Sequence, residues 1–464
     1  MRRSARGLCS EMQHAAIRLS KHKSMLLAAL ALSAGVTLPA YGADLLEIFR
    51  LAKSSDAVYN GARAAWAAAQ EKLPQGRSGL LPSASISAST QYNDRSINFR
   101  DPASLDNNTR FNSNALSLSI TQPIYRRQNT VVYEQSRTQL EQADAVLALS
   151  AQDLITRVAQ AYLDVLLAQD NVALAGAQKT AIAEQLAQAK ISFEVGTATI
   201  TDTHEAQARY DLSVSQEIAA RSDLEIKTRA LEQLIGRAAP ALAPLSPALK
   251  LLSPDPAAMD KWVEAARNNN HQVRAAQSGA TLANQEIERN RAAHYPTLDA
   301  FATWSENRSG AGTFGGAGTD INNKIIGLQL AVPIYQGGLV SSRVREAMAN
   351  EEKARHDLEN ARRTAELNAR QNYLGVTSGI AQVKALEAAL TSSQSALDSS
   401  RLGREVGVRT QVDVLNAQQQ LFSARRDLAQ AKYNYILSTL RLRAAVGRLA
   451  EEDLSAVSAW LERK

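Results

Sequence analysis

The sequence predicts an α+β membrane protein in which one unit of helices and a β-hairpin occurs twice. Three observations carry this prediction. Short motifs recur at offsets of 214, 210 and 211 residues, four segments alternate strictly between apolar and polar residues, and about 70 consecutive residues contain no proline and one glycine. The first observation indicates a duplication, the second indicates two-faced strands, and the third indicates a rod-like helix.

The duplication extends over the whole chain that follows the N-terminal segment. A repeat of this size is a structural unit that cannot bury its own surface alone. We therefore divide the chain into a first structural repeat, residues 44–255, and a second structural repeat, residues 256–464. The matching motifs are residues 81–84 and 295–298, 122–125 and 332–335, and 195–202 and 406–413.

Residues 1–43 are expected to be a secretory signal peptide. Lys21 and Lys23 precede an apolar run at residues 25–34, and small residues near position 40 provide a cleavage point. The run is too short to span a bilayer, and a membrane anchor is the alternative interpretation.

The charge balance of the mature chain implies no nucleic-acid partner. The signal peptide holds six of the 52 Lys and Arg residues and one of the 46 Asp and Glu residues. The remaining 46 basic and 45 acidic residues nearly cancel, so no basic excess remains to bind nucleic acid. The only cysteine, Cys9, also lies in the signal peptide, and the mature chain needs no disulfide.

Two long β-hairpins are expected, at residues 82–124 and 296–334. Strict alternation of apolar and polar residues predicts strands with one apolar and one polar face. Strands of about ten residues with this pattern are typical of outer-membrane barrels, whereas the alternative is a two-faced sheet in a soluble protein. The alternating segments are residues 83–93, 115–121, 298–304 and 326–332.

A long helix is expected at residues 126–195, with a counterpart at 339–402. At 1.5 Å per residue, about 70 residues form a rod of roughly 100 Å, for which a globular domain of this size has no room. Leu154, Val158 and Tyr162 belong to an apolar stripe at helical spacing, and many alanines allow close packing. The rods therefore favour coiled-coil elements of a membrane assembly over a soluble sheet protein.

Four shorter helices complete the two repeats. Their lengths sum in pairs to the lengths of the rods, so each rod can pair with two short helices stacked end to end. Helices 200–236 and 258–292 match the first rod, and helices 411–447 and 46–77 match the second. Residues 237–255 are expected to form an equatorial segment at mid-height, which the C-terminal tail after residue 447 joins.

All strands are expected at one end of the rods, and the turns that follow the rods at the other end. In these turns Gly196 and Gly407 suit helix C-caps, and Thr201 or Asp202 suits the next N-cap. Four strands cannot close a barrel, and open edges do not survive in lipid. Two chains give eight strands with a filled interior, whereas three give twelve and room for a duct. The predicted fold class is therefore a homotrimer with a 12-stranded outer-membrane β-barrel, continued by a long helical coiled-coil barrel.

These features together resemble the TolC family of outer-membrane export ducts. The turn motifs are Val195-Gly196-Thr197 with Asp202 and Val406-Gly407-Val408-Arg409-Thr410 with Asp413, and residues 333–338 are a further match. The resemblance covers essentially the whole mature chain. It implies a homotrimer that is embedded in outer-membrane lipid and extends as a tunnel into the periplasm. It also implies two partners, a periplasmic adaptor protein and an inner-membrane ABC transporter or other pump.

Within the family, the chain resembles the type I secretion exporters, including those that serve repeat-in-toxin proteins such as cyclolysin. The implied function is export of a protein toxin across the periplasm and outer membrane. The outer-membrane component of a multidrug efflux pump is the alternative. A trimeric structural or adhesive coiled-coil protein of the cell surface is the alternative that involves no transport.

The resemblance also implies a periplasmic gate at the turns. By position, Asp413 supplies one carboxylate per subunit to a constriction that favours cations, and Arg409, Asp202 and the adjacent Thr201 restrain the inner coiled coil. The chain departs from the family pattern at two positions. Asn416 replaces a second aspartate of the constriction, and Arg404 replaces an aromatic residue. Helix capping and ordinary surface charge are the alternative roles of the acidic residues.

No enzyme activity, cofactor or metal site is expected. The chain has no Gly-rich phosphate loop and no nucleophile motif, and the histidines of the mature chain are scattered without ligand spacing. These histidines are His204, His271, His294 and His356.

Overall fold

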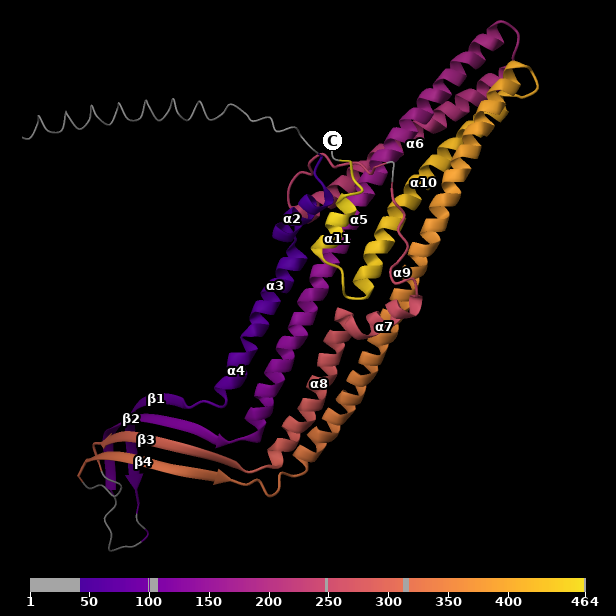
Figure 1. The fold of residues 1–464 in the computed structure, drawn as a ribbon. Coiled ribbons are helices and arrows are strands. Elements are labelled where there is room, and N and C mark those ends of the chain that lie inside the picture. Colours follow the sequence, from indigo (N-terminus) through magenta and orange to yellow (C-terminus); the bar gives the residue numbers. More distant parts are fainter. Residues whose placement is uncertain (1–41, 99, 101–106, 247–248, 312–316, 463–464) are drawn as a thin grey trace, which may run out of the picture.

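The computed structural model in Figure 1 describes residues 42–98, 100, 107–246, 249–311 and 317–462. The predicted signal peptide lies outside these residues, except for its last two positions. The molecule is a long bundle of helices with a four-stranded sheet at one end (Figure 1). Among the described residues, no helix is both long enough and apolar enough to cross a membrane.

The sheet is formed by both hairpins. Strands β1 (Ser83–Ile97), β2 (Asn107–Tyr125), β3 (Thr297–Ser309) and β4 (Thr319–Ala331) are antiparallel in the order β1-β2-β3-β4. The two hairpins are therefore joined through β2 and β3, which leaves β1 and β4 as edges. The predicted fold class, four strands per chain at one end of a helical coiled-coil rod, is confirmed.

One face of the sheet is apolar, and its side chains are in register across the strands. Ile86 pairs with Leu118 and Leu118 with Trp304, while Ala302 pairs with Ile326. None of the described residues covers the side chains of Ile326 and Ile86 on this face, which are 88% and 71% exposed. An uncovered apolar face of this size is typical of a surface that contacts lipid.

The two rods are helices α5 (Arg127–Glu194) and α9 (Leu339–Glu405), which have 68 and 67 residues. Helix α6 (Ile200–Ile235) runs back along α5, and α10 (Gln411–Ala445) runs back along α9. Both rods connect to the sheet at one end and to the returning helices at the other (Figure 1). The predicted separation of strands and turns is thus observed.

Two helices predicted as continuous are interrupted. The helix expected at residues 46–77 is α2 (Leu45–Ser55), α3 (Ala57–Gln70) and α4 (Lys72–Ser78). The helix expected at 258–292 is α7 (Met259–Asn269) and α8 (His271–Arg291), followed by the 3₁₀ turn η1 (Ala292–His294). The breaks between α2 and α3 and between α7 and α8 occur because Asp56 and Asn270 leave the helical conformation, and each caps the next helix with its side chain.

The prediction that helix 46–77 pairs with the second rod of the same chain is wrong. Helices α2, α3 and α4 pack along α5, and α8 lies between α5 and α9. An ion pair between the buried Asp56 and the half-buried Arg157 holds this arrangement at the start of α3. Both Nη atoms of Arg157 on α5 donate to the Asp56 carboxylate, at 2.9 and 3.1 Å, and Asp56 is 4% exposed.

The largest apolar core lies at mid-height, where the equatorial segment crosses the rods. The fully buried hydroxyl of Tyr162 lies 3.1 Å from the carbonyl oxygen of Ala43 and 2.9 Å from that of Ala243. Leu245 pairs with Leu461 in an antiparallel bridge, so the equatorial segment and the C-terminal tail lie side by side. Helix α11 (Glu451–Ser458) of this tail packs against α2.

A bidentate ion pair fixes the junction between sheet and rods. Arg126, the residue before α5, donates from Nε and Nη2 to the two carboxylate oxygens of Asp299 on β3, at 2.8 and 2.6 Å. The first residues of the rod in one repeat are thereby tied to a strand of the other repeat.

Candidate functional site

The turns at the far end of the two rods have the same backbone structure. Gly196 and Gly407 have φ angles of 75° and 79°, in the left-handed region that favours glycine. In the second turn, the N–H of Gly407 donates to the carbonyl of Arg404 and the N–H of Val408 to that of Gly403. The first turn has the equivalent bonds, so both rods end in a Schellman motif, and the predicted glycine C-caps are confirmed.

The helices that follow begin with a capping box, and the predicted N-cap at Thr201 or Asp202 is wrong. Thr199 is the N-cap of α6, and Asp202 is three residues further on. Thr410 and Asp413 have the same roles in α10. A threonine hydroxyl and an acidic side chain satisfy each other's backbone N–H groups in this motif, which explains the shift of the cap toward the N-terminus. Thr201 is an exposed residue of the first helical turn.

The Asp413 carboxylate is held mainly by its own turn. Its Oδ2 accepts from the backbone N–H and the hydroxyl of Thr410, both at 2.9 Å. These bonds hold the pKa of Asp413 below its usual range, and the nearby Arg409 guanidinium adds to the effect. The ion pair with Arg409 is long, at 3.9 Å, and both side chains are substantially exposed. Within one chain, therefore, Asp413 is a preoriented anion that still faces water.

Arg404 connects the two rods. Its Nη1 donates to Oε1 of Gln185 at 3.1 Å and to Oε1 of Gln411 at 2.6 Å, and its Nη2 donates to Oε1 of Gln188 at 2.9 Å. Gln411 also donates to Gln185, at 2.6 Å. One planar guanidinium thus bridges α9, α5 and α10 through neutral amide oxygens.

A second arginine makes the reciprocal connection. Arg209 on α6 donates to the side-chain oxygens of Asn416, at 3.0 Å, and Gln419, both on α10. Together, Arg404 and Arg209 join the α5/α6 pair to the α9/α10 pair near the tip. We call these two groups of contacts the arginine–amide links.

Three of the predicted site residues line one cavity. Asp202, Arg404 and Arg409 border a space of about 400 Å³ between the two turns, together with Thr410 and Gln411. Asp413 and Asn416 lie on the adjacent first turns of α10 and do not line it. The structure thus gathers most of the predicted residues at one end of the molecule.

Sequence reasoning named Asn416 but missed Arg209 and the glutamine partners of both arginines. Gln185 and Gln188 are three residues apart and so share a face of α5 at the level of the turns. That spacing of two polar side chains near a rod end could have indicated a polar contact site. The sequence does not indicate which cation binds there, because Arg404 lies more than 200 positions away.

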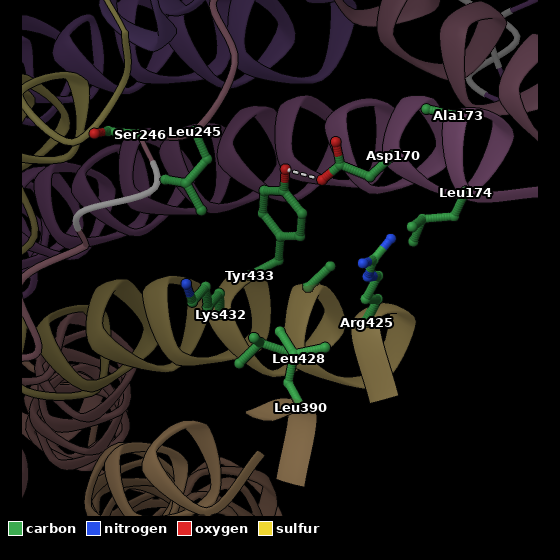
Figure 2. Close-up of a pocket in the computed structure, with 11 residues that line it drawn as sticks. Asp170, Ala173, Leu174, Leu245, Ser246, Leu390, Arg425, Leu428, Lys432 and Tyr433 are labelled. Carbon is green, nitrogen blue, oxygen red and sulfur yellow. Dashed lines mark hydrogen bonds between the residues drawn. The ribbon is translucent and has the colours of Figure 1, made fainter. Parts of the chain in front are cut away.

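A second cavity, of about 420 Å³, lies at mid-height between α5, α9, α10 and the equatorial segment (Figure 2). In this cavity the hydroxyl of Tyr433 donates to Asp170 Oδ2 at 2.7 Å. Burial raises the pKa of the Asp170 carboxyl, and this hydrogen bond opposes the rise. Leucine and alanine residues form most of the remaining wall, and Ser246, Arg425 and Lys432 complete it. In the described part of the chain, no group of three or more His, Cys, Asp or Glu residues could hold a metal.

Comparison with known proteins gives a consistent result. The family described as Outer membrane efflux protein matches residues 55–237 and 262–448. The chain is 34% identical over 421 residues to outer membrane protein TolC of Vibrio cholerae, covering 90% of this chain and 94% of that protein. It is 30% identical over 448 residues to proteases secretion protein PrtF of Dickeya chrysanthemi, covering 95% and 96%. The fold is similar to the Campylobacter jejuni CmeC outer membrane channel, with a TM-score of 0.76 at 18% identity and 90% coverage of both chains.

Proposed function

Because the chain belongs to the outer membrane efflux protein family, we propose that three copies assemble into a duct that carries substrates through the periplasm and outer membrane. The chain is an outer-membrane export channel of the TolC family, as the sequence predicts. Its relatives are named as channel and secretion proteins, which supports the expectation that it is not an enzyme.

The observation that carries the trimer proposal is the open, two-faced sheet. In the described structure the outer edges of strands β1 and β4 are unpaired, and lipid does not tolerate unpaired strand edges. Pairing β4 of one chain with β1 of the next removes both edges. Three chains give twelve strands, the smallest closed set here that leaves a duct.

Type I secretion of a protein, with a toxin as the proposed cargo class, is the specific function we favour. The relative PrtF is named as a secretion protein for proteases. Such a duct requires a periplasmic adaptor and an inner-membrane ABC transporter or other pump, because it has no energy source of its own. The second candidate is multidrug efflux, which the family description favours.

Complementation distinguishes these two functions. The chain is expressed in a strain that lacks its own channel but retains a type I transporter and adaptor, and separately in one that retains a drug pump. Protein secretion without recovery of drug resistance supports the type I proposal. The reverse result overturns it in favour of efflux, and failure of both together with absence from the outer membrane rejects the duct.

At the tip, we place the gate in the turn of the second repeat. Asp413 contributes one carboxylate per subunit to a ring that attracts cations, and Arg409 and the arginine–amide links hold the helix pairs closed. The long distance between Arg409 and Asp413 supports this role, since both side chains remain available to other subunits. Asp202 and Thr201 contribute from the first turn.

Planar-bilayer recordings of purified trimers test this assignment. Arg409→Ala and Asp413→Asn are expected to change conductance or block by divalent cations. Asp202→Asn is the matched comparison and should have the smaller effect, because Asp202 occupies the same capping box but has Ala198 in place of the arginine. Equal effects of Asp202→Asn and Asp413→Asn would remove the special role of the second turn, and unchanged currents in both Arg409→Ala and Asp413→Asn reject the gate assignment.

A further inference from the structure

The face of the sheet opposite to the apolar face carries no charge over five consecutive cross-strand rows. Each row contains one residue from each strand, and the central row is Ser87, Ser117, Ser305 and Asn323. Twelve of the twenty residues have side-chain hydroxyls. The other rows are Ser83, Thr121, Phe301 and Gly327; Ser85, Ser119, Thr303 and Ile325; Ser89, Ala115, Asn307 and Ile321; and Gln91, Ser113, Ser309 and Thr319.

Charged residues of the same stretch lie on the other face. Glu306, Arg308, Asp320 and Lys324 alternate with the uncharged positions and share the face of Ile86 and Trp304, with Lys324 directly opposite Trp304. The strands therefore carry charge, but in these rows they place it away from the polar face. The lack of charge on the polar face is therefore not a result of strands that have few charged residues overall.

The uncharged rows end at charges that have partners. On the side of the rods, the next residue of β3 on this face is Asp299, which is 8% exposed and bound by Arg126. On the other side, the uncharged pair Asn93 and Phe111 follows, and the guanidinium of the next β1 residue on this face, Arg95, lies 4.9 Å from the centre of the Phe111 ring. Five rows two residues apart span about 26 Å along the strand, comparable to the height of the apolar band of an outer-membrane barrel.

We infer that this face gives the assembled duct an uncharged, hydroxyl-lined barrel lumen, which passes cationic and anionic segments of a substrate alike. The inference rests on the proposed trimer, in which the apolar face contacts lipid and the opposite face lines the lumen. Serine and threonine hydroxyls both donate and accept hydrogen bonds, so they solvate either charge without selecting between them. Charge selection is then confined to other parts of the duct.

Cysteine accessibility tests the inference directly, because the chain has a single cysteine, Cys9, in the predicted signal peptide. Ser119→Cys places a thiol in the uncharged rows, and Leu118→Cys places one on the adjacent, apolar face. Trimers carrying a Cys9→Ser substitution are reconstituted in lipid vesicles. They are then treated with methanethiosulfonates that carry either a sulfonate or a trimethylammonium group.

We expect both reagents to modify Ser119→Cys, with a rate ratio within about threefold of that of a free thiol in solution. Leu118→Cys should be protected by lipid. Adding Thr303→Asp, directly opposite Ser119, should shift the ratio toward the cationic reagent by about fivefold or more, which shows that the assay detects charge at this level.

The outcomes distinguish the orientation of the barrel from the absence of charge in its lumen. If Leu118→Cys reacts and Ser119→Cys does not, the proposed orientation of the barrel fails. If Ser119→Cys reacts and Leu118→Cys is protected, but the two reagents differ by more than tenfold relative to the free thiol, only the uncharged lumen is overturned.

Discussion

Removal of the Arg404 guanidinium should open the periplasmic end of the duct. Arg404 donates three hydrogen bonds, and two of them cross from α9 to Gln185 and Gln188 on α5. Hydrogen bonds to a charged group contribute about 1.5–3 kcal/mol when buried, and exposed pairs contribute less than about 1 kcal/mol. Because Arg404 is partly exposed, we assign about 0.5–1 kcal/mol to each crossing bond.

Arg404→Ala therefore destabilises the closed tip by about 1–2 kcal/mol per chain. If three chains open together, the change is about 3–6 kcal/mol, and the equilibrium between open and closed shifts by roughly 10²–10⁴. The assay is single-channel conductance of purified trimers, in which a larger conductance or a higher open probability reports opening. Arg404→Lys should be intermediate, since an ammonium cannot reproduce the planar fork of the guanidinium.

Arg401→Ala is the matched control for Arg404→Ala. Arg401 lies one helical turn earlier on α9, is exposed, and makes no hydrogen bond or ion pair with the described residues. The double variant Arg404→Ala with Arg209→Ala removes both arginine–amide links and should open the tip further than either single change. Conductance that is the same in the Arg401→Ala, Arg404→Ala and double variants would refute the assignment of these links to closure.

Four further predictions concern stability and pH. Arg157→Ala leaves the buried Asp56 carboxylate without its cation and should lower the free energy of unfolding by about 2–4 kcal/mol, measured by thermal or chemical melting in detergent. Tyr162→Phe removes the hydroxyl that binds two backbone carbonyls at mid-height and should cost about 1–2 kcal/mol in the same assay. Gly407→Ala forces a side chain into the left-handed region and should cost about 1 kcal/mol per chain. The pKa of Asp413 is lowered from its ordinary value of 3.8, so the carboxylate stays ionised until the pH falls through this lowered pKa. Both its capping contribution and the cation selectivity, measured by reversal potential, should therefore persist at about pH 4.

The elements that the sequence predicted well are those whose signals are periodic or repeated. The strands, the rods and the glycine turns each depend on a local pattern that occurs in both repeats. The interruptions at Asp56 and Asn270 were not predicted, because the helical pattern continues on both sides of each and a single polar residue makes the break. One capping side chain is a weak signal within 30 residues of helical sequence.

The packing of the short helices was not predictable from their lengths. Helices α5 and α9 differ by one residue, 68 against 67, so a sum of lengths that fits one rod also fits the other. What decides the packing is side-chain contact. The bidentate pair between Asp56 and Arg157 places the start of α3 on α5, and no feature of length or periodicity encodes that choice.

The links at the tip depend on differences between the two repeats. At the offset of 211 residues, Arg404 corresponds to Phe193, and Arg209 corresponds to Gln420. Arg404 donates to amides of the first repeat, whereas Arg209 donates to amides of the second. In two identical repeats, each arginine and each amide would be present twice, and each link would occur twice. Divergence at a few positions instead makes the repeats complementary where the two pairs of helices meet, so the tip can be held by contacts that neither repeat could make with a copy of itself.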